Sequence, residues 1–475
     1  MIKTFKTDVL IIGAGLTGLS CAAGLEGKRE YLLLESTGRP GGLSGSDRKG
    51  GFIFDYSGHL LHFHDPEVRK FILELLDGNV SLLKRDSRIW SHGVYTRYPF
   101  QANTYGLPPE VVSECVRGFL KSYLRSLRRS TPDRLGSPPG NRPHPEFHEG
   151  VYPLPSTLSF KEWALSVFGE GICRHFMFPY NAKLWRRPLS SLGSDWCAPF
   201  VPRPRPEDVI RGAYHDSRTP FGYNACFRYP IMGGIQSLAD ALTKKAGNIL
   251  YNCRVESVDF SEKKALVYGL GTVRFNRLVS TMPLKRLIET ASGGVPASVR
   301  RAGLKLKFTS LSVLNLGAEG RAPGMHWTYF HEKQFPFYRA GIYSNFSRHL
   351  APDGACSYYI EFSHHGKPGN RRQLEESSIR LLRQCGMLGE KSKVVEKHWQ
   401  GIDCAYAIYD REREPALKTI NSFLRSRGAV SAGRYGAWKY SFMEEAIKDG
   451  GNCALQLCGT GIRETAPRKS ELRPI

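Results

Sequence analysis

The 475-residue sequence lacks the features that mark several specialised classes of protein. No stretch approaches the roughly 20 uninterrupted apolar residues that a membrane-spanning helix needs, and no signal-peptide pattern precedes the first predicted strand. We therefore expect a cytoplasmic protein without a membrane span. The 11 cysteines form no CxxC pair and recur at no fixed spacing, so neither a disulfide framework nor a zinc site is predicted. No internal repeat is evident.

Acidic residues are scarce relative to basic ones. Lys and Arg number 67 against 44 Asp and Glu, a formal charge of +23 that favours anionic partners. Charge alone does not choose among phosphorylated metabolites, nucleic acid and an acidic membrane surface. Part of the excess lies in residues 121–142, where Lys and Arg are interleaved with Ser, Pro and Gly and no aromatic platform is present. We interpret this segment as a solvated helix end followed by a flexible insert, and expect no nucleic-acid binding.

The beginning of the chain has the pattern of a βαβ unit. An apolar run at 7–12 is followed by a glycine-rich turn at 13–18, a helical stretch at 19–25 and a second apolar run at 31–34. This order is typical of a doubly wound α/β domain. A further amphipathic helix at 235–245 and strand-like segments at 249–260 and 272–280 indicate that the domain is discontinuous.

The predicted fold class is therefore α/β: a discontinuous, doubly wound, Rossmann-like nucleotide-binding domain with an inserted helical domain and an antiparallel-sheet substrate domain. The helical spacing of 96–224 is interrupted by Pro-rich stretches, and 311–362 contains alternating segments typical of a sheet. The expected boundaries are 1–95, 225–290 and 400–460 for the nucleotide domain, 96–224 for the helical insert with a mobile loop, 291–399 for the substrate domain, and 461–475 for a flexible basic tail.

A dinucleotide-binding motif lies in the first βαβ unit. Gly13, Gly15 and Gly18 form GxGxxG, in which the glycines allow a tight turn, close approach of backbone N–H groups to a pyrophosphate, and close helix–strand packing. Glu35 ends the second strand about 20 residues later, where a carboxylate can bind the ribose hydroxyls. GxGxxG alone is a weak signal, but its strand–turn–helix context makes it a strong one.

A second glycine pair favours FAD over NAD as the cofactor. Arg39, Gly41, Gly42 and Leu43 belong to a segment that suits close approach to the flavin half of a longer dinucleotide. Near the C-terminus, a strand-like run at 429–432 leads into a glycine turn and a short helix that begins near Phe442. We expect that helix N-terminus to stabilise negative charge on a reduced flavin. The cofactor residues predicted there are Gly433, Arg434 and Met443.

Longer motifs extend over nearly the whole chain. They are PGGL with GGFIFDYSGH at 40–59, YPFQANTYGLP at 98–108, FGEGICRHFMFPYNAKLW at 168–185, YFHEKQFPFYRAGIYSNFS at 329–347 and GRYGAWKYSFMEEAI at 433–447. With these motifs, the sequence resembles the FAD-dependent UDP-galactopyranose mutases, especially the eukaryotic-type branch, within the amine-oxidase-like flavoprotein group. The first motif is shared by many flavoproteins, whereas the middle three are more specific to the mutases.

The resemblance implies an isomerase in which reduced FAD is the nucleophile. In this family N5 of the flavin attacks the anomeric carbon, UDP leaves, and the sugar ring reopens and recloses without net redox change. Candidate reductants for the flavin are NADPH and NADH. His59, near the flavin, and Arg339 are the catalytic residues that the resemblance implies. The substrate-binding positions that it implies are Tyr98, Phe100, Gln101, Asn181, Trp185, Tyr329, Arg339, Tyr406 and Tyr440.

Each of these positions also has a purely structural explanation. Tyrosines and tryptophans more often pack in a core or at its rim than touch a ligand, and Trp185 could anchor a helix. Asn181 and Trp185 lie one helical turn apart, so we expect both to face one cleft. His59, His62 and His64 resemble a metal cluster only superficially, because no matching acid or histidine accompanies them, and we predict no metal.

One position departs from the family pattern. The mutases carry a second diphosphate-binding arginine on a mobile loop, and Phe200 stands at that position here. Loss of a charge-assisted contact would cost on the order of 1.5–3 kcal/mol, unless Arg203 or Arg205 replaces it. UDP-galactose itself is therefore less well supported than the general chemistry.

Two other functions are left open by the sequence. An oxidoreductase of the amine-oxidase or protoporphyrinogen-oxidase type would keep the flavin motifs but transfer hydride from its substrate to FAD. A flavin protein without catalytic activity could use its basic surface to dock on a partner or a membrane. Neither the identity of the nucleotide sugar nor self-association into a homo-oligomer can be predicted from the sequence.

Overall fold

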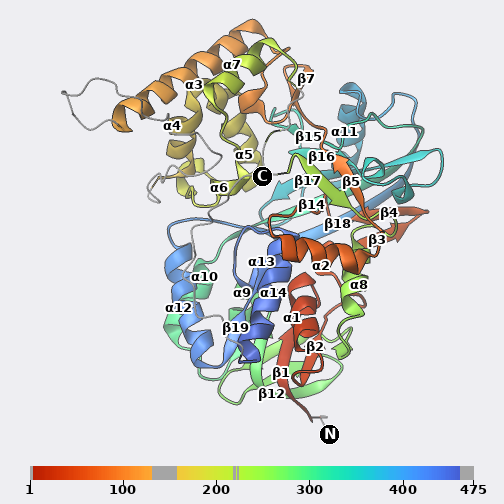
Figure 1. Cartoon of the computed structure of the whole chain (residues 1–475), viewed down its shortest axis with the longest axis vertical. Helices are drawn as coiled ribbons and strands as arrows, with labels where there is room; N and C mark the ends of the chain where they lie inside the picture. Colours follow the sequence, from red (N-terminus) through yellow and green to blue (C-terminus); the bar gives the residue numbers. More distant parts are fainter. Residues whose placement is uncertain (1–3, 131–157, 218–220, 222–223, 460–475) are drawn as a thin grey trace.

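The computed structural model describes residues 4–130, 158–217, 221 and 224–459. The predicted Pro-rich connection at 138–145 and the predicted basic tail at 461–475 lie outside these residues. The described chain forms three parts, which Figure 1 shows stacked along the long axis: an eight-stranded sheet with its helices, a seven-stranded sheet, and a group of helices. The predicted α/β fold class is confirmed.

The eight-stranded sheet contains the first βαβ unit at its centre. β1 pairs in parallel with β2 on one side and with β12 on the other. β10, β11 and β12 form an antiparallel meander at one end of the sheet, and β19 adds to β12 in parallel. The strands are β1 (Thr4–Ile12), β2 (Tyr31–Leu34), β9 (Ile249–Leu250), β10 (Val255–Asp259), β11 (Lys264–Val267), β12 (Gly271–Ser280), β13 (Ala291–Ser292) and β19 (Ala429–Ser431).

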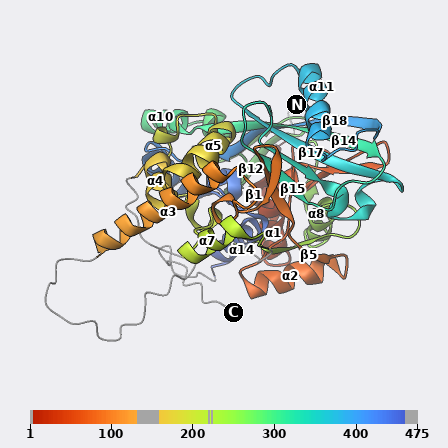
Figure 2. The same cartoon turned by 90° about the horizontal axis from the view of Figure 1, so that it is seen from above.

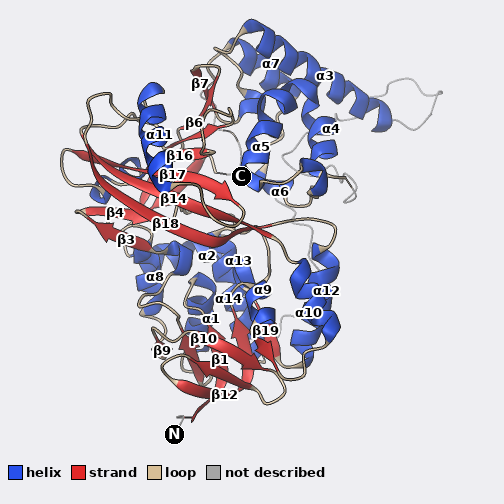
Figure 3. Ribbon diagram, turned by 180° about the vertical axis from the view of Figure 1, so that it is seen from behind, coloured by secondary structure: helices blue, strands red, loops and turns tan. Residues whose placement is uncertain are grey.

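Helices cover both faces of this sheet because its central strands are apolar on both sides. β2 is buried at all four residues, as expected for a parallel strand between two helical layers. α1 and α14 pack against each other on one face, and α10 and α12 pack against each other on the other (Figures 1 and 3). The helices are α1 (Leu16–Leu25), α2 (Pro66–Leu76), α8 (Gln236–Thr243), α9 (Leu284–Glu289), α10 (Ala297–Lys305), α12 (Arg413–Ser426), α13 (Gly433–Gly436) and α14 (Met443–Leu457).

The second sheet is mainly antiparallel and has the order β18-β14-β17-β16-β15-β6-β7. β6 and β15 are its one parallel neighbouring pair. Figure 3 shows the sheet above the nucleotide-binding layer, with α11 (Arg371–Gln384) on its outer side. The strands are β6 (Ser87–Ser91), β7 (Val94–Arg97), β14 (Phe308–Glu319), β15 (Trp327–Phe330), β16 (Arg339–Ile342), β17 (Ala355–His364) and β18 (Val394–Ala407).

Strand pairing differs from the expected domain boundaries in three places. β6 and β7, which lie around the predicted boundary at 95, belong to the seven-stranded sheet, as does the whole of β18 across the boundary at 400. β13 begins at 291, where the substrate domain was expected to start, but it belongs to the eight-stranded sheet. Backbone pairing between segments far apart in the chain decides which sheet each strand joins, and local sequence does not reveal that pairing. The remaining boundaries stay predictions.

The third part is helical, as the spacing of 96–224 predicts. α4 begins with a capping box between Ser159 and Glu162, and a π-helical turn at Cys173–Met177 connects it to α5. Seen from above in Figure 2, α3, α4 and α5 lie side by side, and α3 extends away from the body of the molecule. The helices are α3 (Pro109–Ser130), α4 (Phe160–Ile172), α5 (Phe178–Trp185), α6 (Cys197–Phe200) and α7 (Pro206–Tyr214).

Two short antiparallel pairs connect these parts: β3 (Ser46–Lys49) with β4 (Phe52–Asp55), and β5 (Ser81–Lys84) with β8 (Cys226–Tyr229). Within the described ranges, no helix combines the length and the apolar character that crossing a bilayer requires. All 11 cysteines are free thiols.

Candidate active site

One large cavity of about 1140 Å³ runs between the three parts of the molecule. One end is formed by the glycine turn after β1, and the other by tyrosines from the seven-stranded sheet and the helical group. The cavity is therefore continuous from the predicted dinucleotide site to the predicted substrate site.

The glycine turn has the geometry that a phosphate loop needs. Gly13 has a φ of +98°, a backbone conformation that favours glycine. A Cβ on Gly18 would lie 1.9 Å from the carbonyl oxygen of Gly13, so α1 can pack here only if residue 18 is glycine. A Cβ on Gly15 would meet no protein atom within 4 Å, and Gly15 lines the cavity. The open space beside Gly15 fits a bound pyrophosphate.

Glu35 lies at the carboxyl end of β2, on the cavity wall. Its Oε2 accepts a hydrogen bond from the backbone N–H of Ala14 at 2.8 Å, and its Oε1 accepts from the backbone N–H and the hydroxyl of Thr37, each at 2.8 Å. These bonds hold the carboxylate in place beside the glycine turn. The second glycine segment follows: Arg39, Gly41, Gly42 and Leu43 all line the cavity.

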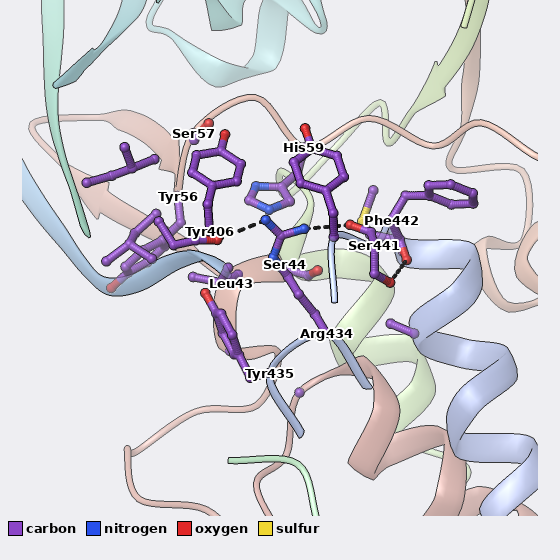
Figure 4. Close-up of a pocket in the computed structure, with 18 of the residues that line it drawn as sticks. Leu43, Ser44, Tyr56, Ser57, His59, Tyr406, Arg434, Tyr435, Ser441 and Phe442 are labelled. Atoms are coloured by element: carbon purple, nitrogen blue, oxygen red, sulfur yellow. Dashed lines mark hydrogen bonds between the residues drawn. The ribbon is translucent and has the colours of Figure 1, made fainter. Parts of the chain in front are cut away.

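Arg434 occupies the middle of the cavity wall. Its Nη1 donates to the carbonyl of Ser441 at 2.6 Å and its Nη2 to the carbonyl of Ala405 at 2.9 Å. Figure 4 shows the guanidinium beside the ring of His59. Burial, together with the charge of Arg434, lowers the pKa of His59 to about 4, so its imidazole is neutral at pH 7. Nδ1 of His59 is buried and has no hydrogen-bond partner among the described residues.

The N-terminus of α14 faces the same region, since Phe442, Met443 and Ala446 line the cavity. The helix has 15 residues and is therefore longer than the short helix that the sequence predicts. Its first-turn N–H groups make this end of the helix electropositive. The neutral His59, Arg434 and the helix N-terminus together provide an environment that stabilises negative charge.

Phenol groups line the end of the cavity where the substrate positions are predicted. Tyr406 and Tyr440 are stacked with ring centroids 5.7 Å apart, and Arg434 lies over both rings at 5.4 and 5.2 Å. Tyr98 and Tyr329 pack with ring centroids 5.3 Å apart. Burial raises the pKa of Tyr98, Tyr406 and Tyr440 above the ordinary value, so these hydroxyls stay protonated and can donate hydrogen bonds at neutral pH.

Arg339 faces this cavity, but its charge is compensated within the protein. Its Nε donates to Oε2 of Glu361 at 2.5 Å and its Nη2 to Oε1 at 2.7 Å, while Nη2 also lies 3.1 Å from the Ser57 hydroxyl. Glu361 is completely buried. No hydrogen bond joins Nη1 to another residue in the described parts of the chain. That edge of the guanidinium is available to a ligand.

Seven of the nine predicted substrate positions line the cavity, and two do not. Phe100 is completely buried and stacks on Phe176 at 5.0 Å. Trp185 is also completely buried, packs on Trp196 at 4.9 Å, and donates from Nε1 to Oδ1 of Asn181 at 3.2 Å. The expectation that Asn181 and Trp185 face one cleft is therefore wrong: only Asn181 reaches the cavity. The seven are Tyr98, Gln101, Asn181, Tyr329, Arg339, Tyr406 and Tyr440.

Asn181 and Gln101 already have protein partners. Nδ2 of Asn181 donates to the Met177 carbonyl at 2.8 Å, and Nε2 of Gln101 donates to the Pro202 carbonyl at 2.7 Å. The bond from Gln101 connects the segment of the predicted substrate positions Tyr98, Phe100 and Gln101 to the segment that carries Phe200.

Phe200, at which the sequence is predicted to depart from the mutase pattern, lies on the cavity wall. Its ring packs edge-on against Tyr440 at 4.4 Å. Both candidate replacements have other partners: Arg203 is over the ring of Trp163 at 5.4 Å, and Arg205 is paired with Asp208 at 3.2 Å. Phe200 and Tyr440 give this part of the wall an aromatic surface, and Arg434 lies over the Tyr440 ring at 5.2 Å.

The segment with His59, His62 and His64 packs near the N-terminal end of α14. His64 pairs with Glu444 at 3.2 Å, an acid that adjacency in sequence does not reveal. Across the described ranges, no group of three or more His, Cys, Asp or Glu side chains is placed to hold a metal ion.

Sequence reasoning missed Glu361, Tyr180 and Tyr338. Tyr180 and Tyr338 line the cavity, and Glu361 supports Arg339 from behind. Glu361 had a signal: it is an acid within the otherwise apolar run 358–362, which alternation assigns to a strand in a core. A buried acid needs a cationic or hydrogen-bonding partner.

Comparisons with known proteins agree with this geometry. A family model described as flavin-containing amine oxidoreductase matches residues 16–458. The structure is similar to that of reduced UDP-galactopyranose mutase, with 27% sequence identity, a TM-score of 0.85, and 96% of each chain covered. The predicted resemblance to these mutases is thereby confirmed.

Two further structures share the fold at lower identity. Wild-type putrescine oxidase bound to putrescine is 16% identical, with a TM-score of 0.64, and the match covers 96% of this chain and 100% of that one. A fatty acid isomerase from P. acnes is 14% identical, with a TM-score of 0.62, and the match covers 95% and 98% of the two chains. Oxidases and isomerases thus share this architecture, and the chain described here belongs to the flavin-containing amine oxidoreductase family.

Proposed function

We propose that this protein is a flavin-dependent nucleotide-sugar mutase that interconverts the pyranose and furanose forms of a UDP-sugar. One observation carries the proposal: a single cavity joins the dinucleotide-type glycine turn to a wall made of Arg339 and six buried or half-buried tyrosines. The tyrosines on this wall are Tyr98, Tyr180, Tyr329, Tyr338, Tyr406 and Tyr440.

FAD fits the residues at the first end of the cavity. The open space at Gly15 can take the pyrophosphate, Glu35 can bind the ribose, and the second glycine pair lies next along the wall. When bound and reduced, the flavin would supply an electron-rich N5 as the nucleophile. Arg434, the N-terminus of α14 and the neutral His59 would stabilise its negative charge.

At the other end, the protein's own groups would hold a diphosphate. Protonated phenols donate hydrogen bonds to phosphate oxygens as charge builds on the leaving group. Arg339 would donate from Nη1, since Glu361 occupies Nε and Nη2. Because Glu361 also cancels the charge of Arg339, we expect recognition of the diphosphate to depend on many phenol hydrogen bonds more than on net charge.

A second candidate is an oxidoreductase that transfers hydride from its substrate to the flavin. The observation that favours it is the aromatic wall formed by Phe200, Tyr440 and Phe442, which suits an apolar substrate as well as a sugar. Several structures with the same fold are oxidases. The cluster of phenols around Arg339 argues against this candidate, because an uncharged substrate does not need them.

The test is an anaerobic incubation of the dithionite-reduced protein with UDP-galactose and other UDP-sugars, followed by chromatography of ring-size isomers. Isomerisation only with reduced flavin supports the mutase. Substrate-dependent bleaching of the oxidised flavin, without isomer formation, identifies the oxidoreductase. A protein that binds flavin but gives neither signal is not a catalyst for these substrates.

A further inference from the structure

A half-buried lysine connects two walls of the cavity without lining it. Lys183 lies on α5, and its ammonium donates three hydrogen bonds to backbone carbonyls: to Phe330 at 3.2 Å, to Glu332 at 2.6 Å and to Phe337 at 3.3 Å. An ammonium has three N–H donors, so this one is fully used. Phe330 is the last residue of β15, and Glu332 and Phe337 lie in the connection from β15 to β16.

Both partners of this contact carry residues of the substrate site. Tyr180 and Asn181 precede Lys183 on α5, within one helical turn of it. Tyr329 directly precedes the first acceptor carbonyl, and Tyr338 directly follows the last one. Tyr180 meets these two rings at centroid distances of 5.5 and 6.1 Å, so the two walls touch where the ammonium holds them together.

The acceptor segment is also held by the β6–β7 turn, since the His92 N–H donates to Glu332 Oε1 at 2.7 Å and His331 pairs with Ser91 at 3.0 Å. Phe330, Phe335 and Phe337 pack on one another at 4.6–5.5 Å within the core of the seven-stranded sheet. The carbonyls on the other side of the segment point to the helical group and accept from Lys183. If Lys183 were replaced by an uncharged side chain of similar length, these carbonyls would lose their hydrogen-bond donor.

We propose that Lys183 is a positioning residue: by binding the carbonyls of Phe330, Glu332 and Phe337, it sets the spacing between the Tyr180–Asn181 wall and the Tyr329–Arg339 wall, and so determines the affinity for the nucleotide sugar. This inference rests on the proposed function. Lys183 does not touch the substrate, and it acts through the residues on either side of it.

The surroundings of Lys183 make this contact sensitive to pH. Burial lowers its pKa to about 7, Glu332 opposes that shift, and Arg186 adds to it. Burial lowers the pKa of the neighbouring His331 to about 3, so that imidazole stays neutral and does not compete. A neutral amine keeps two N–H donors and loses the charge, so deprotonation weakens the contact.

The experiment compares the flavin-loaded wild type with Lys183→Met, Lys183→Arg and the control Lys161→Met, in which the replaced lysine is exposed on α4. Affinity for UDP-galactose is measured by calorimetry, and hydrogen exchange is followed in residues 330–338. We expect Lys183→Met to bind about tenfold more weakly and to exchange faster in this segment, with unchanged flavin content. Lys183→Arg should recover part of the affinity, and Lys161→Met should match the wild type.

Equal affinity of Lys183→Met and the wild type would overturn the positioning role, even if exchange were faster. A wild type that binds no UDP-sugar would instead overturn the proposed function. If Lys183→Met does not fold, the pH profile of the wild type decides. UDP-galactose carries no group that ionises between pH 6 and 8.5, so its affinity should fall across this range in the wild type but not in Lys183→Arg, which stays charged. A flat wild-type profile contradicts the proposal.

Discussion

Arg339 and Glu361 face each other across adjacent strands β16 and β17 and form two parallel hydrogen bonds, at 2.5 and 2.7 Å. Arg339 lines the cavity, and Glu361 is completely buried and does not line it. The pairing fixes the guanidinium in one orientation and leaves the Nη1 edge toward the cavity. The same pairing removes most of the net positive charge that Arg339 would otherwise bring.

Glu361→Gln tests the structural contribution of this pair. The change keeps the shape of the side chain but leaves the buried Arg339 charge without its partner, which should lower the free energy of unfolding by on the order of 3 kcal/mol. Denaturant unfolding of the flavin-loaded protein measures it. Glu376→Gln is the control, because its pair with Arg372 is exposed on α11 and should contribute nothing measurable. Equal stability of the two variants would contradict the pairing.

Phe200→Arg tests the prediction that Phe200 stands where the mutases that this sequence resembles carry a second diphosphate-binding arginine. A guanidinium here would lie beside Tyr440 at the substrate end and should tighten UDP binding by roughly tenfold, with a stronger dependence on salt. Calorimetry at two ionic strengths measures both effects. Ile210→Arg adds the same charge on the exposed side of α7 and controls for net charge. If Phe200→Arg binds UDP no better than the control, the assignment of this position is wrong.

His59 should make the protein less stable in mild acid. Its folded pKa of about 4 lies below the value of about 6.5 for an unfolded histidine. The unfolded state therefore binds more protons between these values, so stability falls as pH decreases from 6.5 to 4, by up to about 2–3 kcal/mol. In the His59→Gln variant, the free energy of unfolding should fall less steeply as the pH decreases from 6.5 to 4.

The measurement is the denaturant midpoint at several pH values between 4.5 and 7.5. His215→Gln is the matched control, because His215 is exposed at the end of α7 and its loss should leave the slope unchanged. A slope that is the same in wild type and His59→Gln would show that His59 is not buried in its neutral form.

The substitutions Gly18→Ala and Gly15→Ala in the glycine turn should have different effects on stability and on FAD binding. A Cβ on Gly18 collides with the backbone of Gly13, so Gly18→Ala should destabilise the protein and deplete its flavin. A Cβ on Gly15 meets no protein atom within 4 Å and would occupy the space proposed for the pyrophosphate. The Gly15→Ala apoprotein should therefore be as stable as the wild-type apoprotein but bind FAD weakly. The ratio of flavin to protein absorbance and the thermal unfolding of the apoproteins separate the two results. Full flavin content in Gly15→Ala would place the pyrophosphate elsewhere.

Local sequence was enough to predict the first βαβ unit and the order of the main elements. Gly13, Gly15, Gly18 and Glu35 depend on short-range geometry, namely a turn, a close helix contact and a strand end, and such geometry is encoded by neighbours in the chain. The motifs that carry the resemblance also identified most of the residues lining the substrate end.

Residues whose roles depend on distant partners could not be assigned in this way. Phe100 and Trp185 belong to apolar or aromatic motifs in which sequence spacing is the same for a ligand contact and for a core contact, and only packing against Phe176 and Trp196 shows that both are buried. In the sequence, Lys183 is likewise indistinguishable from an ordinary lysine on a helix. Only the tertiary structure shows that its ammonium donates to backbone carbonyls such as that of Glu332.

The sequence by itself determined that this chain has a dinucleotide-type glycine turn, an α/β architecture and a set of tyrosines with one arginine, because residue type and local spacing specify these. The tertiary structure alone decided which of them share a cavity, that Glu361 holds Arg339, and that Phe200 packs on Tyr440. These are contacts between segments far apart in the chain, and their geometry comes from the packing of two sheets and a helical group.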